Sequence, residues 1–184
     1  MTQFQFVMVL LSLIVGLGVT DLLSNVARQL KDRESWKFSW LQSLLVVFVF
    51  VALLQQWWES WGLQSIEHWN FGSMLWMLAG PIGLYIAAHL LYPKAAEDVD
   101  LETHYFDNSK AFWLIAAAVV VVATLFRPIS FGMPLLDFDN LASIVLFGSC
   151  MVLGLIKHPL LHKTLAPLLL TALLLDIFVF NPSI

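Results

Sequence analysis

Residues 4–23 read FQFVMVLLSLIVGLGVTDLL and contain one charged side chain, Asp21, close to their end. A helix of about 20 mostly apolar residues is long enough to cross the hydrocarbon core of a bilayer. No Lys or Arg precedes the run, and no small-x-small cleavage site follows it. We therefore interpret residues 4–23 as a retained membrane-spanning helix rather than a signal peptide.

Five further apolar runs follow the first one along the chain. They cover residues 38–58, 72–92, 111–126, 141–156 and 164–180. The runs are continuous, without the polar alternation of a barrel strand, so helices are expected. Of the 184 residues, 60% are hydrophobic and 12% are charged, whereas soluble domains have about 25% charged residues. The sequence predicts an all-α, polytopic integral membrane protein, a six-transmembrane-helix bundle forming a single domain over residues 1–184.

The basic residues predict the orientation of these spans, because Lys and Arg near span ends favour the cytoplasmic side. Eight of the nine fall in alternate gaps between the spans. These eight are Arg28, Lys31, Arg33, Lys37, Lys94, Lys110, Lys157 and Lys163. Only Arg127 lies in a gap of the other set. We therefore expect both termini on the outer side (N-out/C-out), in the inner (plasma) membrane of a bacterium.

Tryptophans cluster near the expected ends of the spans, as in the aromatic belts that mark both membrane interfaces. Trp57, Trp58, Trp61 and Trp69 mark the outer ends, Trp36, Trp40 and Trp113 mark the inner ends, and Trp76 alone lies deeper. A belt is preferred to a ligand-binding aromatic box because these positions follow the interfaces.

Small side chains allow helices in lipid to approach closely. Gly16, Gly18 and Thr20 offer such a face on the first span, Ala116–Ala118 on the fourth, and Cys150 and Gly154 on the fifth. These faces suggest that the first, fourth and fifth spans are central or lie at a subunit interface. Cys150 is the only cysteine, so no intramolecular disulfide forms.

The third span contains Gly80-Pro81-Ile82-Gly83 near its middle. Proline removes a backbone donor and clashes with the carbonyl four residues earlier, so a kinked helix is expected. Two interpretations stay open. The kink either serves packing, or Gly80, Pro81 and Gly83 form a hinge beside a substrate at mid-membrane.

Asp176 is the acid that most needs an explanation, since four apolar residues follow it within the last span. A carboxylate at that depth must be paired, protonated or in contact with water. Arg127 ends the fourth span at a similar depth, and Gln55, Gln56 and Glu59 end the second on the same side. We expect an outer polar cluster of these five residues. The alternative places Arg127 and Glu59 at the interface and leaves Asp176 to a neutral neighbour.

Asp21 and His89 lie near the inner ends of the first and third spans, at similar depth, and can pair. A His–carboxylate couple can exchange protons near neutral pH. The alternative is an interfacial ion pair of Asp21 with Arg28.

Three other histidines fall on the inner side. His158 and His162 are four residues apart and could join His104 as metal ligands, but no carboxylate or cysteine partner accompanies them. Interfacial histidines are the preferred interpretation, no metal site is assigned, and any cofactor is unknown. Residues 94–110, with five acids, are expected to form a solvated loop or a docking segment for a basic partner.

No catalytic or nucleotide-binding motif is present, and no basic patch indicates nucleic-acid binding. The favoured function is a transporter or channel for an ion, a proton or a small solute. The alternative is a membrane sensor, or an accessory or scaffold subunit of a larger membrane complex. An enzyme using the inner histidines is the least favoured class. The expected partners are the lipid bilayer and a second copy or another membrane subunit.

Overall fold

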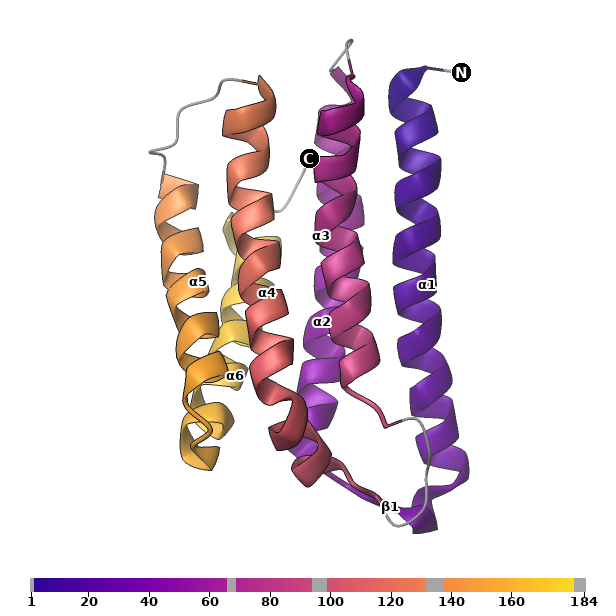
Figure 1. Cartoon of the computed structure of the whole chain (residues 1–184), viewed down its shortest axis with the longest axis vertical. Helices are drawn as coiled ribbons and strands as arrows, with labels where there is room; N and C mark the ends of the chain where they lie inside the picture. Colours follow the sequence, from indigo (N-terminus) through magenta and orange to yellow (C-terminus); the bar gives the residue numbers. More distant parts are fainter. Residues whose placement is uncertain (1, 66–68, 94–98, 132–137, 181–184) are drawn as a thin grey trace.

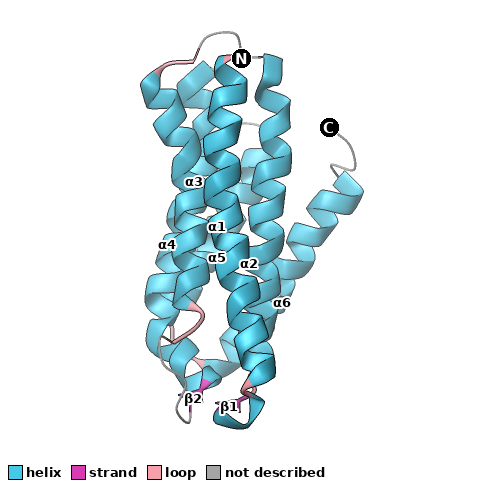
Figure 2. Ribbon diagram, turned by 90° about the vertical axis from the view of Figure 1, so that its right-hand side faces the viewer, coloured by secondary structure: helices cyan, strands magenta, loops and turns pink. Residues whose placement is uncertain are grey.

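The computed structural model describes residues 2–65, 69–93, 99–131 and 138–180. Within these ranges the chain forms six α-helices. Helices α1 to α5 run roughly along the long axis of the molecule, and α6 is tilted away from them (Figures 1 and 2). They are α1 (Gln3–Lys31), α2 (Trp40–Glu59), α3 (Phe71–Leu90), α4 (Leu101–Phe131), α5 (Phe138–Leu155) and α6 (Pro159–Leu175). Five of the described helices are long and apolar enough to cross a membrane, and α5 contains a shorter apolar helix.

Successive helices run in opposite directions, so described basic residues from different connections come together at one end of the bundle (Figure 1). We call this end, where α1 finishes and α2 begins, the basic end. The opposite end, where α1 begins, is called the N-terminal end. The start of α1 and the end of α6 both point toward it (Figure 1). Each of the six apolar runs coincides for most of its length with one of these helices.

Two helices, α4 and α6, begin more than one turn earlier than hydropathy predicts. The expectation of a loop up to Lys110 is wrong, because α4 already begins at Leu101. Asp100 caps this helix, since its carboxylate accepts hydrogen bonds from the backbone N–H groups of Glu102 (3.0 Å) and Thr103 (3.3 Å). α6 begins with Pro159, a residue favoured in the first helical turn, rather than at Thr164. At its far end α6 continues into a short π-helix, η3 (Asp176–Phe180).

Short elements connect the helices outside the apolar spans. The 3₁₀-helix η1 (Arg33–Ser35) leads into the strand β1 (Trp36–Lys37), which pairs in parallel with β2 (Val99–Asp100). This pair joins the α1–α2 connection to the start of α4 at the basic end (Figure 2). A second 3₁₀-helix, η2 (Ser60–Ser65), follows α2 at the N-terminal end. The two strands are a small departure from the expected all-helical chain.

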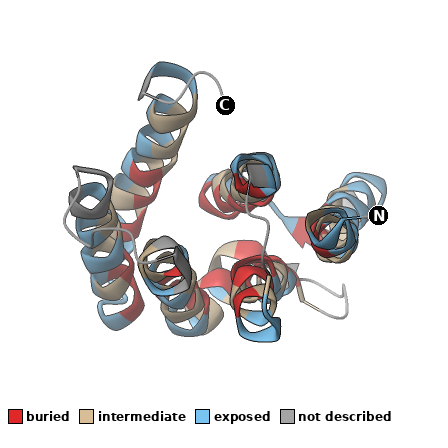
Figure 3. Ribbon diagram, turned by 90° about the horizontal axis from the view of Figure 1, so that it is seen from above, coloured by how far each residue is buried: buried red, intermediate tan, exposed pale blue. Residues whose placement is uncertain are grey.

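The helices do not surround a centre in the predicted way. Viewed along the bundle, α1 and α5 lie on the outside, whereas α3 lies between α1 and α4 (Figure 3). The apolar window of α3 is 44% buried and that of α2 39%, against 28% for α1 and 17% for α6. Within the single chain α1 and α5 are therefore not central, whereas α4 packs against both α3 and α5. The alternative, that these helices lie at a subunit interface, stays a prediction.

Glycines mark the closest helix contacts. A methyl group placed on Gly83 of α3 would clash with a methyl carbon of Val119 on α4. On Gly18 it would lie 2.9 Å from Leu53, and on Gly154 it would lie 3.4 Å from Trp113. Gly16 meets no other helix within 4 Å of that position in the described part of the chain, so it makes no close contact inside this bundle. Gly83 therefore allows α3 and α4 to pack closely, and its expected role in a hinge is a separate prediction.

We expect Gly83→Ala to lower the free energy of unfolding by about 1–3 kcal/mol, the usual effect of overpacking a tight contact. Val119 is β-branched and stiff, so it cannot move aside at little cost. The measurement is thermal or denaturant unfolding of the purified protein in detergent. Gly16→Ala is the matched control and should leave stability unchanged or slightly raised. Equal effects of the two substitutions would contradict this account of the α3–α4 contact.

Candidate functional site

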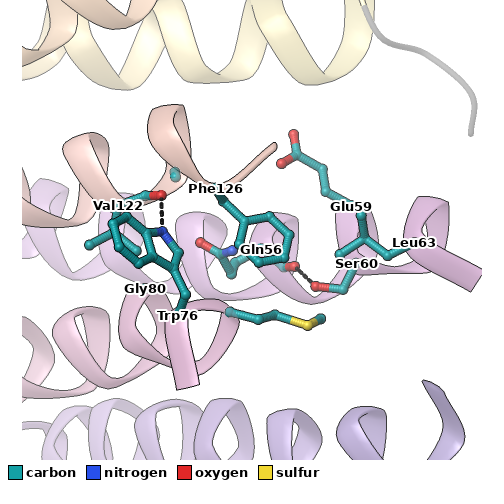
Figure 4. Close-up of a pocket in the computed structure, with 10 residues that line it drawn as sticks. Gln56, Glu59, Ser60, Leu63, Trp76, Gly80, Val122 and Phe126 are labelled. Atoms are coloured by element: carbon teal, nitrogen blue, oxygen red, sulfur yellow. Dashed lines mark hydrogen bonds between the residues drawn. The ribbon is translucent and has the colours of Figure 1, made fainter. Parts of the chain in front are cut away.

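A pocket opens between α2, α3 and α4 in the half of the bundle nearest the N-terminal end. Its volume is about 80 Å³, which is room for a few water molecules or a small cation. It is lined by Gln56, Glu59, Ser60, Leu63, Trp76, Met77, Gly80, Val122, Ala123 and Phe126 (Figure 4). We call this the α2–α4 pocket. It contains two residues of the expected outer cluster, Gln56 and Glu59, and one of the expected hinge residues, Gly80.

Hydrogen bonds fix the walls of this pocket. The indole N–H of Trp76 donates to the carbonyl of Val122 (2.9 Å), which ties α3 to α4 (Figure 4). The hydroxyl of Ser60 donates to the carbonyl of Gln56 (2.7 Å). Trp76 is the one tryptophan that the sequence places deep within a span, and its indole N–H is paired with a backbone carbonyl of the neighbouring helix.

Absence of a side chain at Gly80 makes room for the amide of Gln56. A methyl group on Gly80 would lie 3.0 Å from the Gln56 side-chain oxygen. The side chain of Gln55 donates a hydrogen bond to the carboxylate of Glu59 (2.7 Å). Three members of the expected outer cluster, Gln55, Gln56 and Glu59, are therefore neighbours on α2.

The expected outer cluster also includes Asp176 and Arg127. Asp176 is half-buried and begins η3, beyond the last residue of α6. The side chain of Arg127 lies outside the described part of the chain, and with it the expected Asp176–Arg127 pair. Neither residue is among those that line the α2–α4 pocket in the described structure.

Asp21 and His89 come together near the basic end. Nδ1 of His89 on α3 lies 3.5 Å from a carboxylate oxygen of Asp21 on α1. The side chain of His89 is 56% exposed and that of Asp21 is 26% exposed, so the pair is reached from the surface. The two residues meet because α1 and α3 are parallel neighbours and because each residue lies at a similar distance from the basic end of its helix.

Arg28 does not take the place of His89 as the partner of Asp21 in the described structure. Its guanidinium donates to the Asn25 side chain (2.6 Å) and to the Pro93 carbonyl (3.3 Å), and it lies over the ring of Trp36, 5.6 Å from its centre. Arg28 thereby links α1 to the segments after α3 and before α2. The interfacial Asp21–Arg28 interpretation is replaced by the Asp21–His89 contact.

A buried polar chain joins α4 to α6, and sequence analysis missed it. The indole N–H of Trp113 donates to the hydroxyl of Tyr105 (2.8 Å), and that hydroxyl lies 2.5 Å from Nδ1 of His162. Nε2 of His162 lies 2.9 Å from the carbonyl of Ile156, just after α5. Tyr105, Trp113 and His162 are each at most 2% exposed. We call these three residues the Tyr105 chain.

The bonding pattern determines where the protons lie. A carbonyl only accepts, so Nε2 of His162 carries the proton, and Nδ1 of the neutral ring accepts from the Tyr105 hydroxyl. The Tyr105 oxygen in turn accepts from Trp113. Every polar group in the Tyr105 chain is therefore paired, which is what a buried network needs to be stabilising.

Two sequence interpretations are corrected by the Tyr105 chain. His162 is not an interfacial histidine, because it is fully buried, and Trp113 is not part of a lipid-facing belt. Trp36 is also buried, whereas Trp40, Trp57, Trp58 and Trp61 are exposed as a belt requires. Helical spacing of Leu101, Tyr105, Ser109 and Phe112 was the signal for a buried stripe. Assigning the first three of these residues to a loop concealed it.

Two arrangements of polar side chains stand out in the described part of the chain, a small pocket and a histidine–carboxylate pair. Among the described residues, no group of three or more His, Cys, Asp or Glu side chains is placed to hold a metal ion. The chain matches no protein-family model, no curated protein and no solved structure. The α2–α4 pocket and the Asp21–His89 pair are therefore the candidate sites.

We expect Tyr105→Phe to lower the free energy of unfolding by about 1–3 kcal/mol or more, because it leaves buried nitrogens of Trp113 and His162 without a partner. Tyr85→Phe removes the same atom from a half-buried tyrosine for which the described contacts include no hydrogen bond, and it should change stability by less than about 0.5 kcal/mol. Unfolding of both variants in detergent makes the comparison. A Tyr105→Phe protein as stable as Tyr85→Phe would refute the role given to the Tyr105 chain.

Proposed function

We propose that this chain is an integral membrane protein of the bacterial plasma membrane with both termini outside, and that it moves a proton or a small cation. The orientation follows from the described basic residues, which gather at one end of the bundle, the end expected to face the cytoplasm. On that orientation the α2–α4 pocket lies in the outer half of the membrane and the Asp21–His89 pair near the inner face.

The observation that carries the proposal is that one helix, α3, takes part in both sites. Trp76, Met77 and Gly80 of α3 line the α2–α4 pocket, and His89 of the same helix contacts Asp21. Nine residues separate Gly80 from His89, which is roughly 14 Å along a helix. Each site has a carboxylate, Glu59 outside and Asp21 inside. Carboxylates at membrane depth are typical of pathways for protons and cations.

Apolar packing separates the two sites, so a fixed open pore is not the mechanism we favour. Between Gly80 and His89, the buried residues of α3 are Pro81, Leu84, Ala87 and Ala88. Pro81 cannot donate the usual backbone hydrogen bond, which makes this part of α3 the easiest to bend. In the proposal, α3 kinks at Gly80, Pro81 and Gly83 and opens the pocket to one side at a time.

The competing function is that of an accessory or sensor subunit, which would carry no flux of its own. It is separated from transport by the flux measurement below, because the purified chain is then assayed without any partner.

The orientation can be measured with single cysteines in a Cys150→Ser background. We expect Gln64→Cys, at the N-terminal end, to react on intact cells with a maleimide that cannot cross the membrane. Asp107→Cys, near the basic end, should react only after the cells are opened. Both residues are exposed, so access to water is matched. The reverse pattern would overturn the N-out/C-out orientation.

Flux is tested with the purified chain in liposomes that contain a pH-sensitive or a sodium-sensitive dye. A valinomycin-clamped potassium gradient drives the flux. We expect a flux of protons or Na⁺ well above that of empty liposomes, reduced roughly tenfold or more by Glu59→Gln and by Asp21→Asn. Asp107→Asn, at an exposed carboxylate outside both sites, should keep the flux of the unmodified protein.

The same assay addresses the hinge. Pro81→Ala should slow the flux, because it restores the backbone donor, while Pro167→Ala within α6 should not. If neither ion crosses faster than in empty liposomes, the transport proposal fails and the accessory role takes its place. If Glu59→Gln, Asp21→Asn and Pro81→Ala all leave the flux unchanged, the two sites are not on the pathway.

A further inference from the structure

A second, larger groove lies at the N-terminal end between α1 and α3, separate from the α2–α4 pocket. Its volume is about 410 Å³, within the range of sites that hold small ligands. Thr2, Gln3, Phe6, Val7, Trp69, Asn70, Phe71 and Met74 line it. We call it the α1–α3 groove. Its edges are joined by a hydrogen bond from the backbone N–H of Trp69 to the side-chain oxygen of Gln3 (3.0 Å).

The lining changes from polar to apolar with depth. α1 and α3 both begin at this end, so the first residues of each helix are the outermost. The polar lining residues Thr2, Gln3 and Asn70 all lie at the two helix starts, beside the aromatic Trp69 and Phe71. About one turn deeper, roughly 5 Å on, the lining residues Phe6, Val7 and Met74 are all apolar. This order matches a lipid molecule, whose glycerol region lies above its acyl chains.

Two amide groups at the rim have donors to spare. The side-chain oxygens of Gln3 and Asn70 accept backbone N–H groups, from Trp69 (3.0 Å) and Ser73 (2.8 Å) respectively. These bonds fix the amide orientation, so each –NH₂ is the free end. Neither –NH₂ donates a hydrogen bond within the described structure. Both residues are exposed, so a ligand can reach them.

The described lining includes no charged side chain, and its aromatic residues are of the kind found at membrane interfaces. Free N–H donors above an apolar wall suit the ester carbonyl oxygens of a glycerolipid better than they suit an ion. We propose that the α1–α3 groove is a binding site for one phospholipid of the outer leaflet. Its ester carbonyls bind Gln3 and Asn70, and an acyl chain lies on Phe6 and Met74. This proposal does not depend on transport.

The test uses a phosphatidylcholine that carries a photoactivatable diazirine near the ester end of one acyl chain. The full-length protein is reconstituted with this lipid, irradiated and digested, and the labelled residues are mapped by mass spectrometry. Residues 3–7 and 71–74 should be labelled about three- to tenfold more than Ile144 and Val145 of α5, the contribution of one or two hydrogen bonds. Ile144 and Val145 are 61% and 64% exposed and report ordinary lipid contact.

Two variants remove the proposed contacts while keeping the fold. Gln3→Glu keeps the acceptor for Trp69 but loses the amide donor, and Gln64→Glu is its charge-matched control at an exposed glutamine. Phe6→Ala removes one wall, and Leu13→Ala is its control on the same helix. Phe6 is 53% and Leu13 61% exposed, so neither change empties the core. Labelling of residues 3–7 and 71–74 should fall about three- to tenfold in Gln3→Glu and in Phe6→Ala. It should stay unchanged in the controls Gln64→Glu and Leu13→Ala.

Labelling of residues 3–7 and 71–74 at the level of Ile144 and Val145 would overturn the proposal, because the groove would then hold only ordinary boundary lipid. Enhanced labelling that survives both Gln3→Glu and Phe6→Ala would overturn it too, since the named contacts would not be the cause. The unfolding temperature of each variant in detergent is measured alongside. A loss of labelling counts only when that temperature is unchanged, and otherwise Asn70→Asp, which keeps the helix cap, replaces the failing variant.

Discussion

Backbone hydrogen bonding in a lipid environment is the constraint on which this structure depends. Hydrocarbon offers no partner for an N–H or a carbonyl group, so each crossing segment must pair its own backbone as a helix. The same medium removes the usual drive to bury apolar side chains, which leaves close packing and a few polar contacts to hold the helices together. Close packing is seen where Gly83 of α3 meets Val119 of α4. A polar contact joins the same two helices where Trp76 donates a hydrogen bond to the carbonyl of Val122.

Polar groups within the bundle show how that constraint is met. The Tyr105 chain pairs each of its polar atoms, and it holds the α5–α6 turn against α4. Asp21 and His89 pair at the edge, where water reaches the histidine. The α2–α4 pocket differs from both, because the side chains of Gln56 and Glu59 border a cavity of about 80 Å³. That difference is why the pocket, and not the better-connected Tyr105 chain, is proposed to receive a ligand.

Prediction from sequence succeeded where depth alone decides a contact. Asp21 and His89 were matched by their distance from the inner ends of their spans, and α1 and α3 proved to be neighbours. Gln55, Gln56 and Glu59 are close because they share one helix. Prediction from hydropathy failed where a helix extends beyond its apolar run. Hydropathy placed Tyr105 in a loop and His162 at an interface, since it registers the charges around these residues and not the helical spacing that buries them.

By itself, the sequence determined the number of apolar runs, their helical form and the end of the bundle at which the basic residues gather. These follow from local hydrophobicity and charge, which act on each segment separately. Only the tertiary structure decided that α3 lies between α1 and α4, that Gly83 rather than Gly16 makes a tight contact, and that Tyr105 meets His162. Such choices depend on which helix faces touch, and in lipid most apolar faces are equally acceptable until shape and hydrogen bonding distinguish them.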